Sequence, residues 1–162
     1  SFSKTVVPSL RIGWVTGPAP VLAFMSQIKE AADLMSSPLN QQALYYLMTE
    51  MDLDAHIRML SKHYYQHMVV MQDYLKTLDG DLVSWNEPKG GMFLWAKVHE
   101  SINTTELLSK ILEHGVAYIP GAPFYVENPQ QNTLRLNFTH SSPEKIKIGM
   151  ERLTAAFLQS LK

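Results

Sequence analysis

Cysteine is absent from the 162-residue sequence, and so is any apolar run long enough to span a membrane as a helix. Without thiols, the chain can form neither a disulfide nor a thiolate metal site. A membrane-spanning helix needs about 20 consecutive apolar residues, so we expect a protein that does not enter the membrane. The lack of cysteine is compatible with the reducing cytoplasm, where we expect the protein to be located.

Charged side chains are also few. They make up 18% of the residues, against about 25% in an average soluble domain. The 14 Lys and Arg residues nearly balance the 15 Asp and Glu residues, and the hydrophobic content is 46%. This composition excludes intrinsic disorder and argues against a nucleic-acid-binding surface within these residues. A low charged fraction is expected if another domain or subunit covers part of the surface.

Hydrophobic periodicity predicts helices and strands in both halves of the chain. The expected helices cover residues 20–34, 38–51, 52–78, 103–115 and 142–161, and the expected strands cover residues 10–16, 82–86, 92–98, 116–119 and 133–138. The turn Pro88-Lys89-Gly90-Gly91 between two of these strands is typical of an antiparallel hairpin. The sequence therefore predicts an α+β protein with a small antiparallel sheet flanked by helices. The strand at 10–16 has no evident partner.

The strongest chemical pattern occupies the first thirteen residues, which read Ser1-x-Ser3-Lys4-x-x-x-Pro8-x-x-Arg11-x-Gly13. A lysine amine can form a Schiff base with an aldehyde. Hydroxyl groups and a planar guanidinium are suited to holding a phosphate. On chemistry alone, an ordinary surface loop explains the pattern equally well.

Four segments, taken in order, resemble those of the fold type I aminotransferases, which depend on pyridoxal 5′-phosphate (PLP). They are Ser1–Gly17; Pro88–Trp95, similar to Pro-x-Gly-Gly-Met-Phe; Gly115–Phe124, similar to Gly-Val-x-x-x-Pro-Gly-x-x-Phe; and Leu134–Phe138, similar to the strand that binds the substrate carboxylate. The resemblance covers the entire chain. It is nearest to the 2-aminoadipate and kynurenine aminotransferases and to the aminotransferase-like domain of MocR-type regulators.

The resemblance implies roles for individual residues. Lys4 matches the catalytic lysine that forms the Schiff base with PLP and moves the proton between the substrate α-carbon and the cofactor. Ser1, Ser3 and Arg11 match the residues that hold the phosphate of PLP. Arg135 matches the arginine that pairs with the substrate α-carboxylate, and its place on the polar side of strand 133–138 agrees with this role. The structural alternatives are a loop lysine for Lys4 and structural ion pairs for the two arginines.

Other candidate residues have weaker support. Gly90 and Gly91 allow either a close approach of the backbone to the substrate or a plain hairpin turn. His63 and His67 are four residues apart, a spacing that can bind a metal. No carboxylate accompanies them in a zinc-protease pattern, so we expect no metal site.

In the family, the residues that hold the PLP ring precede the lysine, whereas this sequence begins three residues before Lys4. The resemblance therefore implies that the chain is part of an α/β PLP-transferase fold. Residues 1–50 would be the C-terminal end of the large cofactor-binding domain, residues 51–79 a long connecting helix and residues 80–162 the small C-terminal domain. We expect the full-length parent to be a homodimer acting on an amino acid and a 2-oxo acid, and the isolated chain to be inactive.

Two other functions remain open. The first is the PLP-binding effector domain of a GntR/MocR-type transcriptional regulator, in which DNA is bound by an N-terminal domain outside these residues. The second is a small α+β interaction domain with no catalytic role. The sequence that precedes Ser1 would separate the regulator from the enzyme.

Overall fold

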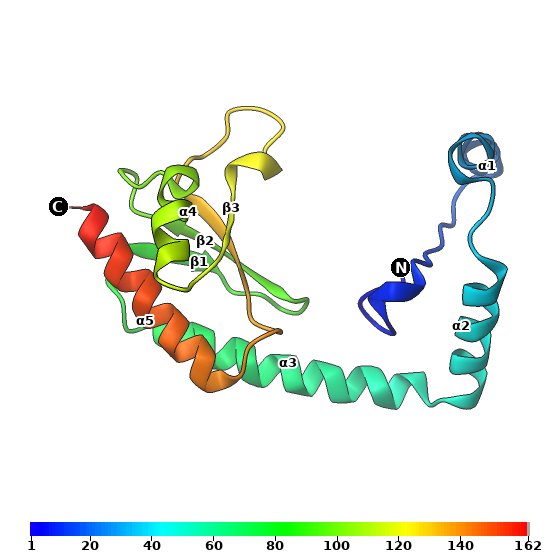
Figure 1. The fold of residues 1–162 in the computed structure, drawn as a ribbon, viewed down its shortest axis with the longest axis horizontal. Helices are drawn as coiled ribbons and strands as arrows, with labels where there is room; N and C mark the ends of the chain where they lie inside the picture. Colours follow the sequence, from blue (N-terminus) through cyan, green and yellow to red (C-terminus); the bar gives the residue numbers. More distant parts are fainter. Residues whose placement is uncertain (162) are drawn as a thin grey trace. The chain divides into compact units, whose positions relative to one another are not determined.

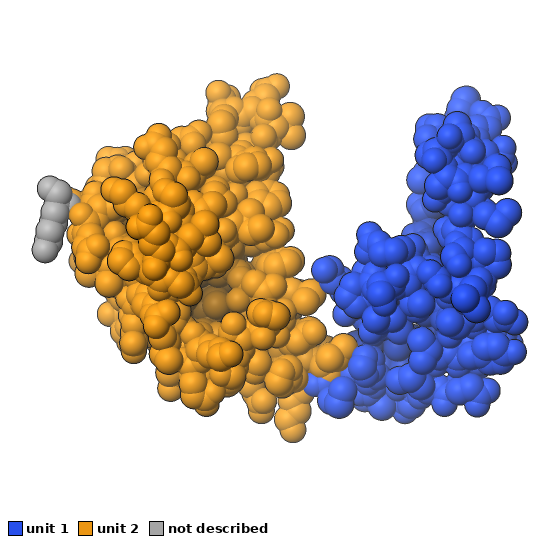
Figure 2. Space-filling view, viewed as in Figure 1, with its two compact units in different colours: residues 1–59 blue, residues 60–162 orange. Residues whose placement is uncertain are grey.

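A computed structural model describes residues 1–161 and divides the chain into two compact units. The first is Ser1–Met59, and the second begins at Leu60 (Figure 2). No helix in the described part of the chain is both long and apolar enough to cross a membrane.

Two helices of the first unit, α1 (Ala19–Asp33) and α2 (Pro38–Glu50), lie where the periodicity predicts them (Figure 1). Each has a proline in its first turn, where the missing N–H removes no helical hydrogen bond. The first unit as a whole buries little apolar surface. Leu44 is 5% exposed, whereas Phe24 and Ile28 are each 69% exposed. The first unit therefore depends on local hydrogen bonds more than on a core of its own.

The strand predicted over residues 10–16 is wrong. The structure has a short 3-10 helix, η1 (Pro8–Leu10), followed by residues 11–18 without regular secondary structure. Arg11 adopts a φ of +53°, a left-handed conformation that an extended strand does not contain. The residue types favour a strand, but a strand also needs a partner for its N–H and C=O groups. Within the described residues, segment 11–16 receives one backbone bond, from the Phe2 N–H to the Ile12 C=O at 3.1 Å.

The longest helix, α3 (Leu53–Leu75), begins after Asp52. The Asp52 carboxylate accepts a hydrogen bond from the Ala55 N–H at 2.8 Å, so it caps the helix at the start of the predicted range 52–78. The helix ends at Leu75 rather than at the predicted Leu78 because the chain turns there, with the Leu78 N–H donating to the Leu75 C=O at 3.1 Å. The buried residues of α3 all belong to the second unit: His67, Met68, Met71, Gln72 and Leu75.

A four-stranded antiparallel sheet forms the centre of the second unit, with the strand order β1-β2-β4-β3. Its strands are β1 (Val83–Asn86), β2 (Phe93–Val98), β3 (Ile119–Pro120) and β4 (Thr133–Asn137). The predicted hairpin and the strand near residues 133–138 are confirmed. The strand expected at residues 116–119 is instead the two-residue β3, because only these residues reach β4.

Helices cover one face of this sheet. Alternate residues of β2 and β4 are buried and point into the core, among them Leu94 and Leu134, which are no more than 1% exposed. The core also takes side chains from α3, from α4 (Thr104–Glu113) and from α5 (Pro143–Ser160), which lie beside the sheet in Figure 1. Asn103 caps α4 and Ser142 caps α5, each at the first residue of the predicted helix ranges 103–115 and 142–161. The α+β fold class is confirmed.

A buried polar cluster ties the start of α4 to the β3–β4 edge of the sheet. The Thr104 hydroxyl lies 2.8 Å from the Thr133 C=O, and the Tyr118 hydroxyl donates to the Thr104 C=O at 2.6 Å. Burial raises the pKa of Tyr118 to about 12, so its hydroxyl remains a donor at neutral pH. The Gly121 N–H donates to the Thr133 C=O at 2.7 Å. These bonds hold the following 3-10 helix, η2 (Ala122–Phe124), against β4.

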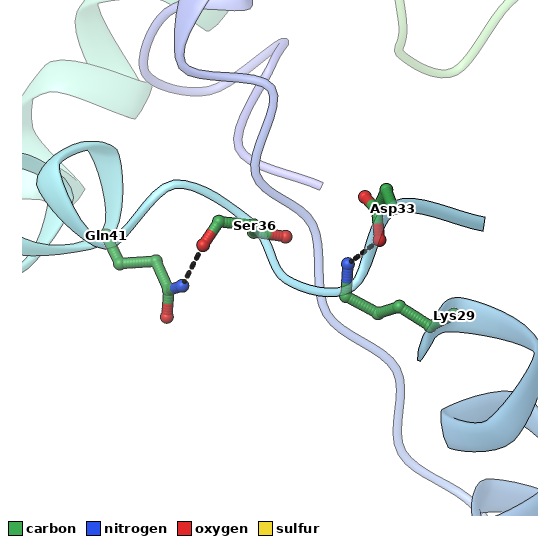
Figure 3. Close-up of polar contacts among 4 residues, drawn as sticks. All are labelled: Lys29, Asp33, Ser36 and Gln41. Atoms are coloured by element: carbon green, nitrogen blue, oxygen red, sulfur yellow. Dashed lines mark hydrogen bonds and ion pairs between the residues drawn. The ribbon is translucent and has the colours of Figure 1, made fainter. Parts of the chain in front are cut away.

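Two separate sets of hydrogen bonds stabilise the first unit. One set lies in the linker between α1 and α2, and the other joins α2 to η1. Figure 3 shows Lys29 paired with Asp33 at 2.6 Å and the Gln41 side chain donating to the Ser36 C=O at 2.9 Å. The neighbouring Asn40 side chain donates instead to the Leu10 C=O at 3.2 Å. Asn40 therefore holds η1, whereas Gln41 holds the linker.

Replacing Asn40 by alanine should loosen the segment around η1. A net hydrogen-bond contribution of about 0.5–1.5 kcal/mol predicts that amide hydrogen exchange in residues 9–13 will be about two- to tenfold faster. Gln41→Ala is the matched control, and exchange in residues 9–13 should keep its original rate. Equal acceleration in both variants would contradict the separate role of Asn40.

Replacing Gly121 by alanine should destabilise the second unit. A Cβ at this position would lie 2.7 Å from the Thr133 Cβ and 2.8 Å from its carbonyl carbon, closer than real contacts allow. We expect the free energy of unfolding, measured with urea, to fall by about 1–3 kcal/mol. Gly149→Ala within α5 meets no atom within 4 Å and should be neutral or stabilising by about 0.5–1 kcal/mol. Equal effects of the two substitutions would show that the close approach is not a constraint.

Candidate functional site

The first thirteen residues form a loop whose two ends meet. The Phe2 N–H donates to the Ile12 C=O at 3.1 Å, and the Val6 N–H donates to the Phe2 C=O at 2.9 Å. At the closed end, a Cβ built on Gly13 would lie 3.7 Å from Ser1, an ordinary contact distance. Backbone bonds thus bring the two ends of the motif together although the predicted strand is absent.

Ser1, Ser3, Lys4 and Arg11 all belong to this loop. The Ser1 hydroxyl accepts a hydrogen bond from the Ser3 N–H at 3.3 Å. The Lys4 side chain is exposed. Arg11 donates through Nη1 to the Pro8 C=O at 3.2 Å, and this bond holds its guanidinium close to η1.

The loop carries two cations, Lys4 and Arg11, that no ion pair of the described residues includes. The ion pairs described in the first unit join Lys29 to Asp33 and Arg58 to Asp52, and neither includes Lys4 or Arg11. An amine, two hydroxyls and a guanidinium form a donor set that fits an aldehyde and a phosphate. The residues present therefore fit PLP, and their assignment to it stays a prediction.

In the second unit, Arg135 lies on β4 directly opposite Trp95 of β2 and Ile119 of β3. Directly opposed residues point to the same side of a sheet, so these three side chains lie on the side away from the core. The guanidinium carbon is 4.0 Å from the centre of the Phe93 ring and 4.9 Å from that of Phe124. Both distances are within the range of a cation–π interaction.

No carboxylate of residues 1–161 forms an ion pair with Arg135. None of the ion pairs among the described residues includes it, so the structural ion pair considered as an alternative does not form there. The Nε of Arg135 is buried and has no hydrogen-bond partner within the described part of the chain. A guanidinium held in this way can receive a carboxylate from a ligand through its planar fork of N–H donors.

A cavity of about 430 Å³ lies between α3 and the turn that joins β1 to β2. Its lining includes Tyr64 and Met68 from the helix and Lys89, Gly90 and Gly91 from the turn. Gly91 has a φ of +85°, a conformation that glycine adopts without strain. The geometry of the turn therefore accounts for the glycine at position 91. Gly90 lines the cavity, so it fits both a plain hairpin turn and a close approach of the backbone to a substrate.

His63 and His67 of α3 lie next to each other, and only His67 is buried. Their ring centres are 4.3 Å apart, and the Nδ1 of buried His67 is 3.1 Å from the Phe138 C=O. No group of three or more potential metal ligands occurs among residues 1–161.

The contacts of Phe93 and Phe124 with Arg135 are features that sequence reasoning missed. Both phenylalanines belong to the segments that resemble the aminotransferases. That resemblance was the only signal in the sequence that could have indicated their role. Their meeting point depends on the β2–β4 register and on the position of η2, and neither can be obtained from local sequence patterns.

Comparison with known proteins gives consistent matches. The chain matches the family model Aminotransferase class I and II over residues 1–153. It is 34% identical over its full length to aromatic-amino-acid aminotransferase 1 of Thermococcus litoralis, of which it covers 39%. It is also 28% identical, over 93% of its length, to the uncharacterized HTH-type transcriptional regulator YisV of Bacillus subtilis, of which it covers 31%.

A solved structure matches the same residues. The crystal structure of Pyrococcus horikoshii kynurenine aminotransferase, in complex with PMP, KYN and KYA, superposes on the whole chain with a TM-score of 0.92 and 33% identity. The chain covers 40% of that structure and thus spans less than half of each relative named here. With the family model covering residues 1–153 and the fold agreeing throughout, the chain belongs to the aminotransferase class I and II family.

Proposed function

We propose that the chain is the C-terminal part of a PLP-dependent aminotransferase that transfers an amino group between an α-amino acid and a 2-oxo acid. The observation that carries the proposal is the Arg135 guanidinium, which no carboxylate of the described residues neutralises. A ligand carboxylate is the natural partner of such a group. Under this proposal residues 1–50 belong to the cofactor-binding domain, residues 51–79 connect the domains and residues 80–162 form the small domain.

PLP is the proposed cofactor, and the first unit would hold it. When bound, PLP supplies an electron sink that makes the α-proton of an amino acid labile. The Ser1 and Ser3 hydroxyls and the Arg11 guanidinium would hold its phosphate. The amine of Lys4 would be the attachment point. The charge of the loop supports these assignments, because neither of its two cations belongs to an ion pair among the described residues, and such a pair of cations favours an anion.

Lys4 also has a proposed role in proton transfer. In this role the Lys4 amine would take the proton from the substrate α-carbon onto Nζ as a general base. It then returns the proton as a general acid. The Lys4 side chain is exposed, and no ion pair among the described residues holds its amine, so the amine is free to reach a bound molecule.

Arg135 would orient the substrate. A bidentate pair between its guanidinium and the α-carboxylate fixes both the position and the rotation of the amino acid. Such orientation lowers the entropic part of the activation barrier. The carboxylate is common to all α-amino acids, so Arg135 does not select the side chain of the substrate.

A regulatory function is the second candidate, and the match to YisV favours it. In that case the same residues would bind PLP and an amino compound as a signal, and a separate segment would bind DNA. Specific DNA binding by the full-length gene product, without transamination, would distinguish this function from the enzyme.

Homodimer formation and a cytoplasmic location stay predictions. The first unit exposes large apolar side chains, among them Trp14 (66%) and Leu39 (74%). Apolar surfaces of this kind commonly mark contacts with another domain or subunit. They support the proposed dimer and the proposed large domain.

Replacing Lys4 by arginine in the full-length gene product tests the proposal. Arginine keeps the positive charge, but its guanidinium does not lose a proton in proteins, so it can act neither as nucleophile nor as base. We expect amino transfer from phenylalanine or 2-aminoadipate to 2-oxoglutarate to fall by at least about a hundredfold. Borohydride reduction followed by peptide mapping should attach the cofactor to Lys4 in the unchanged protein.

Lys29→Arg is the matched control, because arginine can keep the ion pair with Asp33. Its rate should stay within about twofold of the unchanged protein, as expected for an exposed ion pair. A Lys4→Arg variant that retains more than a tenth of the original rate would refute the proposed role.

A further inference from the structure

We propose that Phe93 and Phe124 are positioning residues that hold the Arg135 guanidinium ready for a carboxylate. This inference rests on the proposed function, in which Arg135 binds the α-carboxylate of the substrate. The rings replace the acidic side chain that commonly fixes an arginine within a protein.

An arginine on a sheet surface has many rotamers, so something must select the one that binds. An Asp or Glu partner would do so, but none of the described ion pairs includes Arg135. The contacts that the structure provides are aromatic, at 4.0 Å from the guanidinium carbon to the Phe93 ring and 4.9 Å to the Phe124 ring. A cation is attracted to an aromatic face within about 6 Å.

Aromatic contacts have a functional advantage over an acidic partner. A ring interacts with the cation through its face, whereas a carboxylate binds to the N–H groups in the plane of the guanidinium. An internal carboxylate would occupy the donors that the substrate needs and would neutralise the charge that attracts it. Rings restrict the side chain and leave both the charge and the donors available.

The two rings are themselves fixed by the fold. Phe93 is a β2 residue paired with Asn137 of β4. Phe124 meets Trp95 edge to face, with ring centres 5.5 Å apart and an interplanar angle of 85°. The backbone of η2 is held through Gly121, whose N–H donates to the Thr133 C=O at 2.7 Å. Rings from two separate segments therefore converge on one guanidinium.

Core packing does not account for Phe124. Its side chain is 51% exposed, so burial in the apolar core contributes little to its position. The buried Nε of Arg135, which has no hydrogen-bond partner among the described residues, shows that the guanidinium is enclosed on one side without being neutralised. A cation that is partly enclosed but has no acidic partner is expected where a ligand supplies the negative charge.

Leucine substitutions in the full-length gene product test the inference. Phe93→Leu and Phe124→Leu keep apolar bulk and remove the aromatic face. Each should weaken binding of 3-phenylpropanoate, a carboxylate probe without an amino group, by about 2- to 30-fold in calorimetric titration. The KM for phenylalanine should rise by the same factor while kcat changes little, since the carboxylate is bound in both the ground and transition states. Phe93→Tyr, which keeps the ring face, should restore the affinity.

A double-mutant cycle shows whether the rings act through Arg135. In an Arg135→Lys background, either leucine substitution should lose most of its effect on probe affinity. Ile119→Val is the matched control, because Ile119 lies opposite Arg135 without contributing a ring. Its affinity for the probe should stay within about twofold of the unchanged protein.

The outcomes separate this inference from the function on which it rests. If Arg135→Lys alone leaves probe affinity unchanged, Arg135 is not the carboxylate site, and the proposed role of Arg135 fails together with the inference. If Arg135→Lys weakens binding but both leucine variants bind as tightly as the unchanged protein, only the inference is overturned. Should Phe93→Leu fail to fold, the half-exposed Phe124 decides the question alone.

Discussion

The antiparallel pairing of β2 with β4 is the constraint on which the second unit depends. Its register sets Leu94 opposite Leu136 and Trp95 opposite Arg135, which gives the sheet one apolar side and one side with a cation among aromatic rings. Because side chains alternate with a period of two, a slip of one residue would turn Arg135 into the core. An unpaired charge buried there would be strongly destabilising. The core and the candidate carboxylate site therefore require the same register.

The two units are stabilised in different ways. The second unit has one continuous core, to which its sheet and the helices α3, α4 and α5 contribute side chains. The first unit buries Leu44 and otherwise depends on hydrogen bonds. These include helix caps, the bonds that close its N-terminal loop and single side-chain bonds such as that from Asn40 to the Leu10 C=O. Single hydrogen bonds contribute about 0.5–1.5 kcal/mol each. The residues proposed to hold PLP thus lie in the part of the chain that has the least internal support.

The sequence predicts elements well where their determinants are local. The starts of the helices predicted at residues 52, 103 and 142 and the hairpin around Gly91 follow from residue type and spacing. Each is found in the structure, with Asp52, Asn103 and Ser142 as the capping residues. The strand over residues 10–16 was wrong because a strand also needs a partner, which local residue types do not reveal. For the candidate site, motifs indicate Lys4 and Arg135. The rings around Arg135 could not be predicted, because they come together only through long-range pairing.

The buried Nε of Arg135 is the most informative single atom of the second unit. Proteins rarely leave a buried donor without a partner, since desolvation costs about 1–3 kcal/mol and more for a charged group. A merely structural arginine would relax toward solvent or toward an acid, whereas this one is held against two rings. The rings offset part of its unfavourable desolvation, and under the proposed function the carboxylate of the substrate would satisfy the remaining donors. Under the proposed function, this arrangement would supply part of the organisation needed for binding before the substrate arrives, because the rings already restrict the guanidinium.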